Sequence, residues 1–219
     1  MLAIPSYDGK VDVHFADSLL RTYILAQQYK IEILPFYICY DSIIQIVRND
    51  LIANAYYSKV DKIFFVDSDM GWNAEDFISI VLRDEDVVGG IVPSRWYDDE
   101  NWNVHINREE DIIYSRDKEL IKVEKIGTGF LSLTRKVIVD LWNNSPKYTK
   151  ENSNNTVANI FEVKITDNKI ISEDYILSTK LKKLGYSLWG AHKINPTHIG
   201  ISINKRNFSE YLQQNNYKI

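Results

Sequence analysis

Strand and helix patterns alternate over the first 92 residues, and this alternation restricts the fold of the 219-residue chain more than any other feature. Short apolar segments at residues 2–4, 31–39, 63–66 and 87–92 are typical of buried strands. The segments between them repeat apolar residues every three or four positions, as amphipathic helices do. Strands that alternate with helices build a mostly parallel sheet with crossover helices. We therefore predict an α/β fold.

Turn and capping residues set the expected boundaries of these elements. Pro5 is expected to stop the first strand, and Pro35 is expected to place the second strand at a sheet edge or at a bulge. Ser42 and Asn73 are expected to cap the second and third helices. The first helix is predicted over residues 13–29, with Phe15, Leu19, Leu20, Tyr23, Ile24 and Ala26 on its apolar face.

Residues 93–205 have a different character, with shorter and more polar segments. Residues 160–165 alternate apolar and polar side chains, which predicts an antiparallel strand. A helix is predicted to start at Ser172 and to close at Gly185. We expect one domain with a nucleotide-binding half (1–92), an acceptor-side half with a small antiparallel excursion (93–205), and a polar tail with one weak helix (206–219).

The composition excludes several classes of protein. A net charge of −4 gives no basic field for nucleic acid. The longest apolar run, residues 33–40, is too short to span a membrane. No signal-peptide pattern is visible, so a cytoplasmic protein is expected. The single cysteine, Cys39, cannot form an internal disulfide and is predicted to be a core residue in a reducing compartment.

Asp67 and Asp69 directly follow the third predicted strand, with the small residue Ser68 between them. Ligands of open α/β sheets bind at the carboxyl ends of the strands. Two carboxylates so close together repel each other unless a cation lies between them. Carboxylate oxygens are hard ligands that suit Mg²⁺ or Mn²⁺, and such an ion is typically also bound by phosphate oxygens of a substrate. The alternative is that Asp67 ends the strand and Asp69 sits in a turn, because short motifs often match by accident.

Five further features are candidate site residues, and each has a structural alternative. The loop at residues 5–9 follows the first strand at the same sheet edge and is otherwise a plain turn. Arg48 can meet a phosphate or the Asp pair, and is otherwise a solvated helix charge. Glu173 and Asp174 can supply a base, or can simply stabilise a helix start. His198 can complete a metal site, or can be structural. The pattern Gly127-Thr128-Gly129 allows close backbone approach to a ligand, or marks a bulge.

Several motifs occur in a recognisable order from residue 4 to residue 200. They are Ile-Pro-Ser-Tyr, Asp41-Ser42 before Arg48-Asn49, Phe-Val-Asp-Ser-Asp-Met, Val-Val-Gly-Gly-Ile-Val-Pro, Ile-Gly-Thr-Gly-Phe, Ser-Glu-Asp-Tyr with Leu-Gly-Tyr, and His-Ile-Gly. Together they resemble the nucleotide-sugar-dependent glycosyltransferases of the GT-A fold. The similarity is greatest to the compact single-domain enzymes of large DNA viruses, phages and bacteria.

The resemblance implies a role for each matching residue. Asp67, Ser68 and Asp69 would bind ribose and a Mn²⁺ or Mg²⁺ on the diphosphate, with His198 completing the metal sphere. The nucleobase, usually uracil, would be held by the first loop, which consists of Pro5, Ser6, Tyr7 and Asp8. Arg48 would lie by the base or diphosphate, and Glu173 and Asp174 would face donor or acceptor. Residues 95–102, with Trp96 and Trp102, would border the acceptor and stack on sugar rings.

The expected partners are a UDP-sugar donor and a glycan or glycoprotein acceptor, in the host cytoplasm if the chain is viral. Two alternatives stay open. A sugar-nucleotide pyrophosphorylase would need a Gly-rich, basic phosphate loop near the N-terminus, which residues 5–9 do not provide. A catalytically inactive relative would bind nucleotide or glycan without turnover. The transferred sugar, the acceptor, the stereochemical outcome and the oligomeric state are not indicated by the sequence.

Overall fold

A seven-stranded sheet forms the centre of the computed structural model, which describes residues 1–93, 101–107, 109, 111–151, 154–200, 203–204 and 207–214. The strands lie in the order β2 (Pro35–Cys39), β1 (Leu2–Ser6), β3 (Lys62–Val66), β9 (Phe130–Thr134), β5 (Val87–Gly90), β14 (Leu188–Ala191) and β7 (Leu120–Val123). All run in one direction except β9 and β7, which are antiparallel to their neighbours. The predicted mixed, mostly parallel sheet is confirmed.

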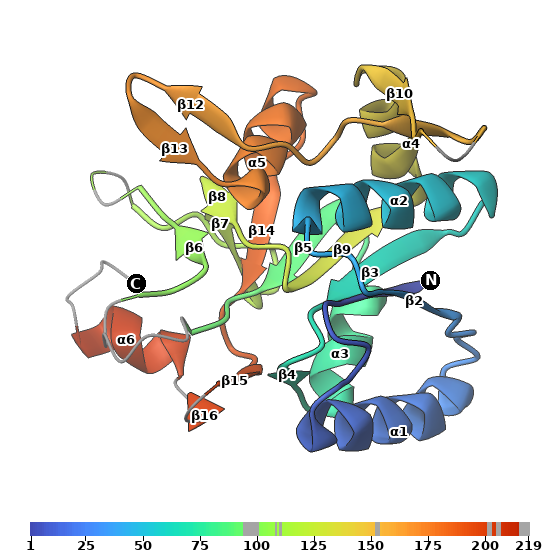
Figure 1. Cartoon of the computed structure of the whole chain (residues 1–219). Coiled ribbons are helices and arrows are strands. Elements are labelled where there is room, and N and C mark those ends of the chain that lie inside the picture. The colour runs from blue at the N-terminus through green and yellow to red at the C-terminus, as the bar shows by residue number, and fades with distance from the viewer. Residues whose placement is uncertain are drawn as a thin grey trace.

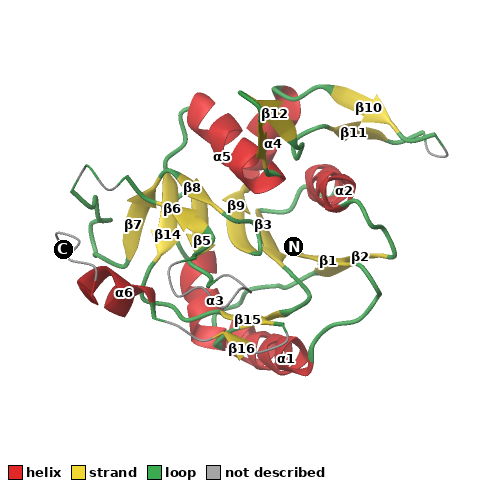
Figure 2. Cartoon of the chain, turned by 60° about the vertical axis from the view of Figure 1, so that its left-hand side comes forward, coloured by secondary structure: helices red, strands yellow, loops and turns green. Residues whose placement is uncertain are grey.

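Helices cover both faces of this sheet (Figure 1 and Figure 2). The helices α2 (Ile44–Tyr57), α4 (Arg135–Asn143) and α5 (Glu173–Lys183) build one core with one face of the sheet. The helices α1 (Val13–Gln28) and α3 (Ala74–Val81) build a second core on the opposite face. The helix α6 (Phe208–Gln214) buries Phe208 and Leu212 in the first core, so the segment predicted as a polar tail contributes to the packing.

Small antiparallel elements surround the sheet, as the predicted excursion requires. Three of them are the pairs β6 (Val104–His105) with β8 (Lys125–Ile126), β10 (Lys147–Thr149) with β11 (Thr156–Ala158), and β12 (Lys164–Thr166) with β13 (Lys169–Ile171). The fourth is a sheet of β4 (Met70–Gly71), β15 (Thr197–Ile199) and β16 (Ile203–Asn204). The pairing of β15 with β4 places His198 opposite Met70, one residue beyond Asp69.

Several of the predicted boundaries are wrong. The second strand begins at Pro35 rather than at residue 31, and the fourth ends at Gly90 rather than at residue 92. The strand β1 continues through Pro5 to Ser6. Because β3 pairs with β1 only at Leu2 and Ala3, Pro5 needs no N–H on that side. The helix α2 has no side-chain cap from Ser42; instead Asp41 Oδ1 accepts a hydrogen bond from the Ile43 N–H at 2.9 Å.

The first helix has the predicted period but a different buried face. Leu20 and Ile24 are exposed, whereas the polar residues Ser18 and Thr22 are buried. The reason is Trp72, whose backbone N–H donates to Ser18 Oγ and whose ring N–H donates to Thr22 Oγ1, each at 2.9 Å. A buried indole needs a hydrogen-bond acceptor, and the helix supplies one at these positions.

Two further expectations about single segments are wrong. Residues 160–161 are not in a strand, although both side chains are fully buried, and the strand in this region is β12. The Asn49 side chain satisfies the backbone here, since its Oδ1 accepts from the N–H groups of Ile160 and Phe161 at 3.0 and 2.7 Å. Cys39 is only partly buried, because β2 is an edge strand as Pro35 indicates.

None of the described helices is long and apolar enough to cross a bilayer.

Candidate active site

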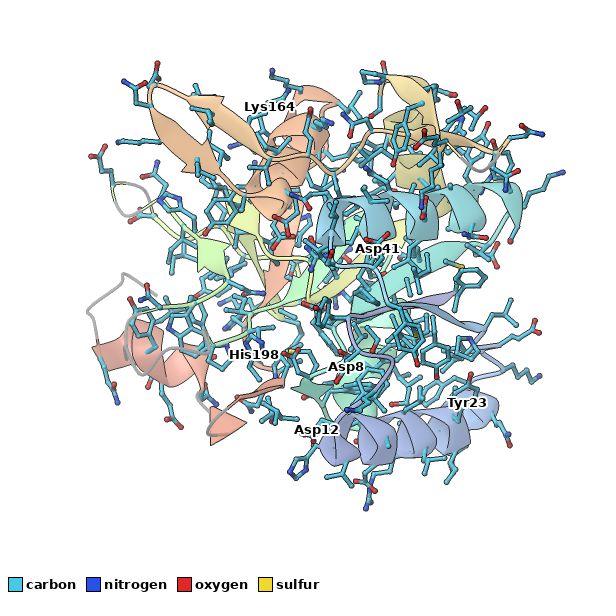
Figure 3. The ribbon with its side chains drawn as sticks, viewed as in Figure 1. Asp8, Asp12, Tyr23, Asp41, Lys164 and His198 are labelled. Carbon is cyan, nitrogen blue, oxygen red and sulfur yellow. The ribbon has the colours of Figure 1, made fainter. Side chains whose placement is uncertain are left out.

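The candidate site residues come from separate elements that meet at one end of the sheet. Pro5 and Ser6 end β1, and the turn at residues 67–69 directly follows β3. Glu173 and Asp174 form the first turn of α5, and His198 lies on β15. Asp41, Asp8 and His198 are seen in Figure 3 on three different segments around this end of the sheet. This position, beyond the carboxyl ends of parallel strands, is where open α/β sheets bind ligands.

The backbone of the turn at residues 67–69 is anchored at every residue. The Asp67 N–H donates to the Gly129 carbonyl at 3.1 Å. The Ser68 carbonyl accepts from Asp12 N–H at 3.0 Å, and the Asp69 carbonyl accepts from Ile199 N–H at 2.9 Å. Gly129 allows this close approach, because a Cβ atom there would lie 2.9 Å from Asp67 Oδ2. The turn is therefore held in place before any ligand binds.

Arg48 binds three carboxylates, and we call these four residues the carboxylate clamp. Its Nη1 donates to Glu173 Oε1 at 2.9 Å and to Asp174 Oδ1 at 2.7 Å. Its Nη2 lies 3.2 and 3.3 Å from the two oxygens of Asp67. The Arg48 side chain is only 5% exposed. The structure thus brings together four predicted site residues from α2, the end of β3 and the start of α5.

The clamp carries more negative than positive charge. Burial by itself lowers the pKa of Arg48, but Asp174, Asp67 and Glu173 outweigh burial and raise that pKa above its ordinary value. Burial and the neighbouring Asp174 raise the pKa of Glu173, against the attraction of Arg48. One guanidinium faces three carboxylates, with Asp69 close by in sequence. An anionic ligand would be repelled here unless it brought a cation with it.

Three residues support the clamp in ways that were not predicted. The Phe161 ring lies under the Arg48 guanidinium, 5.8 Å from its carbon to the ring centroid. Asn49 fixes Phe161 by a further bond from its Nδ2 to the Phe161 carbonyl at 3.0 Å. The buried Thr128 hydroxyl donates to Asp174 Oδ1. The Gly-Thr-Gly pattern and the Arg48-Asn49 pair pointed to Thr128 and Asn49, whereas no sequence signal marked Phe161.

Asp69 and His198 form a second group, which we call the Asp69–His198 pair. His198 Nε2 lies 3.6 Å from Asp69 Oδ2, and His198 Nδ1 lies 3.1 Å from the Pro93 carbonyl oxygen. Because a carbonyl only accepts, Nδ1 carries the proton in this contact. The other ring nitrogen, Nε2, is the one that faces the Asp69 carboxylate. Metal-binding histidines are commonly fixed in this way by a carbonyl on the other nitrogen.

The donor chemistry of this pair fits a divalent cation. Mg²⁺ and Mn²⁺ often take only one or two protein ligands and complete their coordination with phosphate oxygens and water. Among the described residues, no three His, Cys, Asp or Glu side chains are grouped to hold a metal. Asp67 is turned toward Arg48, which explains why it does not join Asp69 and His198. Asp67 as a third metal ligand stays a prediction.

Two cavities meet at Asp67. The first, which we call the Ser68 cavity, has a volume of about 230 Å³ and is lined by Pro5, Ser6, Tyr7, Asp41, Ser42, Ile44, Val47, Arg48, Asp67, Ser68 and Asp69. The second, the Trp102 cavity, measures about 480 Å³ and is lined by Asp67, Met70, Val92, Pro93, Asn101, Trp102, Asn103, Gly127, Gly129, Asp174 and His198. Asp174 faces the second cavity, whereas Glu173 lines neither.

The residues of the first loop differ in what they offer a ligand. Tyr7 is 73% exposed at the Ser68 cavity. The Ser6 hydroxyl donates to the Lys10 carbonyl at 2.7 Å, so it closes the loop. Asp8 does not line the cavity, and its Oδ1 accepts from Lys10 N–H at 3.1 Å. Pro5 and Tyr7 are thus better placed than Asp8 to contact a ligand.

Most of the aromatic loop predicted at residues 95–102, including Arg95 and Trp96, lies outside the described residues. Trp102 is described and lines the Trp102 cavity. Its ring also packs edge-on against Phe208 of α6, with centroids 4.8 Å apart. Trp102 therefore joins the cavity wall to the core.

Comparison with known proteins establishes the fold alone. No family model and no curated protein matches this sequence. A197 from STIV is similar in structure over 91% of this chain and 85% of its own, with a TM-score of 0.54 and 16% identity. The inositol-1-phosphate CTP transferase from T. maritima covers 90% of this chain and 88% of its own, with a TM-score of 0.43 and 14% identity. A glycosyltransferase involved in the glycosylation of the major capsid of PBCV-1 covers 65% of each chain, with a TM-score of 0.28 and 10% identity.

Proposed function

We propose that this chain is a metal-dependent glycosyltransferase that moves a sugar from a nucleotide-sugar, in the first place a UDP-sugar, to a hydroxyl of a glycan or another acceptor. One observation carries the proposal. An acidic centre, made of the carboxylate clamp and the Asp69–His198 pair, lies between two cavities that share Asp67. Such an arrangement supplies separate places for a donor and an acceptor around one reacting bond.

The Ser68 cavity is the proposed donor side. Tyr7 offers an exposed ring on which a base can stack, and Arg48 and Asp67 line the same cavity. Asp69 and His198 would hold a Mn²⁺ or Mg²⁺ that offsets the charge of the diphosphate. When bound, such an ion acts as a Lewis acid and stabilises the departing diphosphate.

The Trp102 cavity is the proposed acceptor side, and Asp174 is the carboxylate placed to act there. The described hydrogen bonds of Asp174, from Arg48 and Thr128, both reach Oδ1. Its Oδ2 can therefore accept a hydrogen bond from an acceptor hydroxyl and take the proton as a general base. Glu173 lines neither cavity and bonds to Arg48 Nη1, so it is better described as a positioning residue.

A donor panel tests the proposal directly. The protein is incubated with UDP-, GDP- and CMP-sugars in the presence of Mn²⁺, and nucleotide release is followed by mass spectrometry with and without a mixture of glycan acceptors. We expect UDP release from a UDP-sugar that stops on chelation with EDTA and returns with Mn²⁺. Tighter calorimetric binding of GDP than of UDP would refute the base assignment. Binding without any release would identify an inactive nucleotide-binding relative.

A further inference from the structure

The two edge strands of the central sheet differ in how their outer backbone groups are covered. At the edge strand β7, residues 113–115 cover the backbone, with the Ser115 N–H donating to the Leu120 carbonyl at 2.9 Å and the Lys122 N–H donating to the Ile113 carbonyl at 2.8 Å. The exposed Lys122 adds a charge in the middle of that strand. At the other edge, no described strand pairs with the outer side of β2, as Figure 2 shows. Natural sheets normally cover or charge their edges.

Among the described residues, none pairs with the outward backbone groups of β2, and these groups can be assigned to individual residues. On the inner side, the Leu34 carbonyl accepts from Leu2 N–H and the Tyr40 N–H donates to the Ser6 carbonyl. Backbone groups alternate along a strand, so the even-numbered residues face β1 and residues 35, 37 and 39 face outward. Pro35 lacks an N–H, but its carbonyl still points outward together with both backbone groups of Tyr37 and Cys39.

The side chains at this edge are apolar or aromatic, and each is at least one third exposed. Residues 33–40 contain no charged residue. Leu34, Phe36, Tyr37 and Tyr40 are 47, 37, 46 and 81% exposed. Since a fully buried side chain of this size removes roughly 150–250 Å² from water, the exposed parts amount to roughly 400 Å² per chain. An uncharged apolar strand edge of this kind suits an apolar, extended partner.

We propose that β2 is a homodimer interface, in which the β2 strands of two copies pair antiparallel and join their sheets. The occupant is a second copy because the edge is complementary to itself. With the two-fold axis at Tyr37, the two Tyr37 residues exchange backbone hydrogen bonds, and each Cys39 N–H donates to the Pro35 carbonyl of the other copy. Pro35 lacks an N–H in both copies, so the two bonds from Pro35 to the Cys39 carbonyl of the other copy are missing from this pattern.

The exposed apolar area at β2 agrees with the apolar area that a stable dimer interface buries. A standard interface buries about 800 Å² on each partner, of which about 56–58% is apolar. The roughly 400 Å² of apolar side chain at β2 is close to that share. No charge lies between residues 33 and 40, so two copies with a net charge of −4 each meet without like-charge repulsion along the paired strands.

Sedimentation equilibrium over a concentration series tests the interface with the whole chain. We expect the mass to rise from 25.5 kDa toward twice that value as the concentration increases. Tyr37→Lys places two like charges opposite each other and should weaken the dimer by about tenfold or more, with circular dichroism and nucleotide binding unchanged. Ile113→Lys is the matched control, since Ile113 is 51% exposed at the covered edge. It should leave the dimer intact.

A disulfide crosslink tests the register of the paired β2 strands independently of the Tyr37→Lys variant. Opposed residues in a hydrogen-bonded antiparallel pair have Cα atoms about 5.5 Å apart, a spacing that a disulfide accepts. Tyr37→Cys in a Cys39→Ser chain should therefore form a covalent dimer on mild oxidation much faster than Ile113→Cys in the same background. A monomer of 25.5 kDa at every concentration, or equal crosslinking at both positions, would overturn the proposal.

Discussion

The carboxylate clamp and the Asp69–His198 pair lie on either side of one short turn, yet they depend on different partners. In the clamp, Arg48 supplies the counter-charge from within the protein and is 5% exposed. In the Asp69–His198 pair, the two side chains are 24 and 18% exposed and stand 3.6 Å apart. Asp67 and Asp174 of the clamp are as exposed as Asp69, so the two groups differ in the buried guanidinium and not in the exposure of their carboxylates. The clamp is completed by folding, whereas the pair is held in place by its backbone and is the proposed site of the metal ion.

Because of this difference, substitutions in the carboxylate clamp and in the Asp69–His198 pair should affect different properties. Removing the buried Arg48 cation leaves the three carboxylates of the clamp without compensation and destabilises the fold. Removing a donor from a partly exposed pair changes ligand binding more than folding. We therefore predict that the unfolding free energy depends on the clamp and that metal affinity depends on the Asp69–His198 pair.

Arg48→Met should have the largest effect. It leaves Asp67, Glu173 and Asp174 close together without a cation, which should cost about 3–5 kcal/mol of unfolding free energy. Urea denaturation at pH 7 measures the loss. Arg21→Ala is the matched control, because Arg21 pairs with Asp17 on the exposed face of α1 and should change nothing measurable. Equal stabilities of the Arg48→Met variant and the wild type would show that the clamp does not stabilise the fold.

Asp174→Asn should mainly change catalysis. If Asp174 Oδ2 accepts the acceptor proton, turnover should fall about 10²–10⁴-fold while UDP binding stays nearly unchanged. The hydrogen bonds from Arg48 and Thr128 to Oδ1 can both be kept by the amide oxygen, so the clamp should remain assembled. Steady-state kinetics and calorimetry separate the two quantities. Wild-type turnover would return Asp174 to a structural role at the start of α5.

His198→Gln should weaken Mn²⁺ binding in the presence of UDP about 10- to 100-fold, because it removes the imidazole that is aligned by the Pro93 carbonyl. Electron paramagnetic resonance of free Mn²⁺ measures the affinity. In metal-free buffer the unfolding free energy should be almost unchanged, in contrast to Arg48→Met. His105→Gln is the control, since His105 is exposed on β6. Unaltered Mn²⁺ affinity in His198→Gln would remove His198 from the proposed metal site.

The sequence predicted the parts of the fold that depend on local pattern. Strands and helices alternate over the first 92 residues, as their apolar spacing indicates. The convergence of Arg48, Asp67, Glu173 and Asp174 was also expected from the order of the motifs along the chain, although α5 follows β13 of an antiparallel hairpin and not a strand of the central sheet. Their roles in binding and catalysis stay predictions.

The parts that could not be predicted depend on partners far away in the chain. The strand β9 lies antiparallel between β3 and β5, although some 40 residues separate β5 from β9 along the chain. Periodicity reports which residues are apolar, but it does not report which strand will be the neighbour. Likewise, Asn49 replaces strand pairing at residues 160–161 through side-chain bonds across more than 100 positions. Nothing in either segment alone marks that contact.

Glu173→Gln should have the smallest effect, and its sign depends on pH. Burial and Asp174 raise the pKa of Glu173 above the ordinary value of 4.5, so the folded state favours the protonated acid. The stability from this preference is present below pH 4.5 and is lost as the pH rises through the raised pKa. A neutral glutamine avoids that loss, so the variant should gain stability relative to the wild type between mildly acidic and neutral pH.

The measurement for Glu173→Gln is urea denaturation of both proteins across that pH range. The difference in unfolding free energy should be near zero at pH 4 and should grow in favour of the variant toward pH 7. Turnover should fall less than in Asp174→Asn, because Glu173 lines neither cavity and acts through Arg48. A variant that is less stable than the wild type at pH 7 would mean that the attraction between Glu173 and Arg48 outweighs the cost of burying a third carboxylate in the clamp.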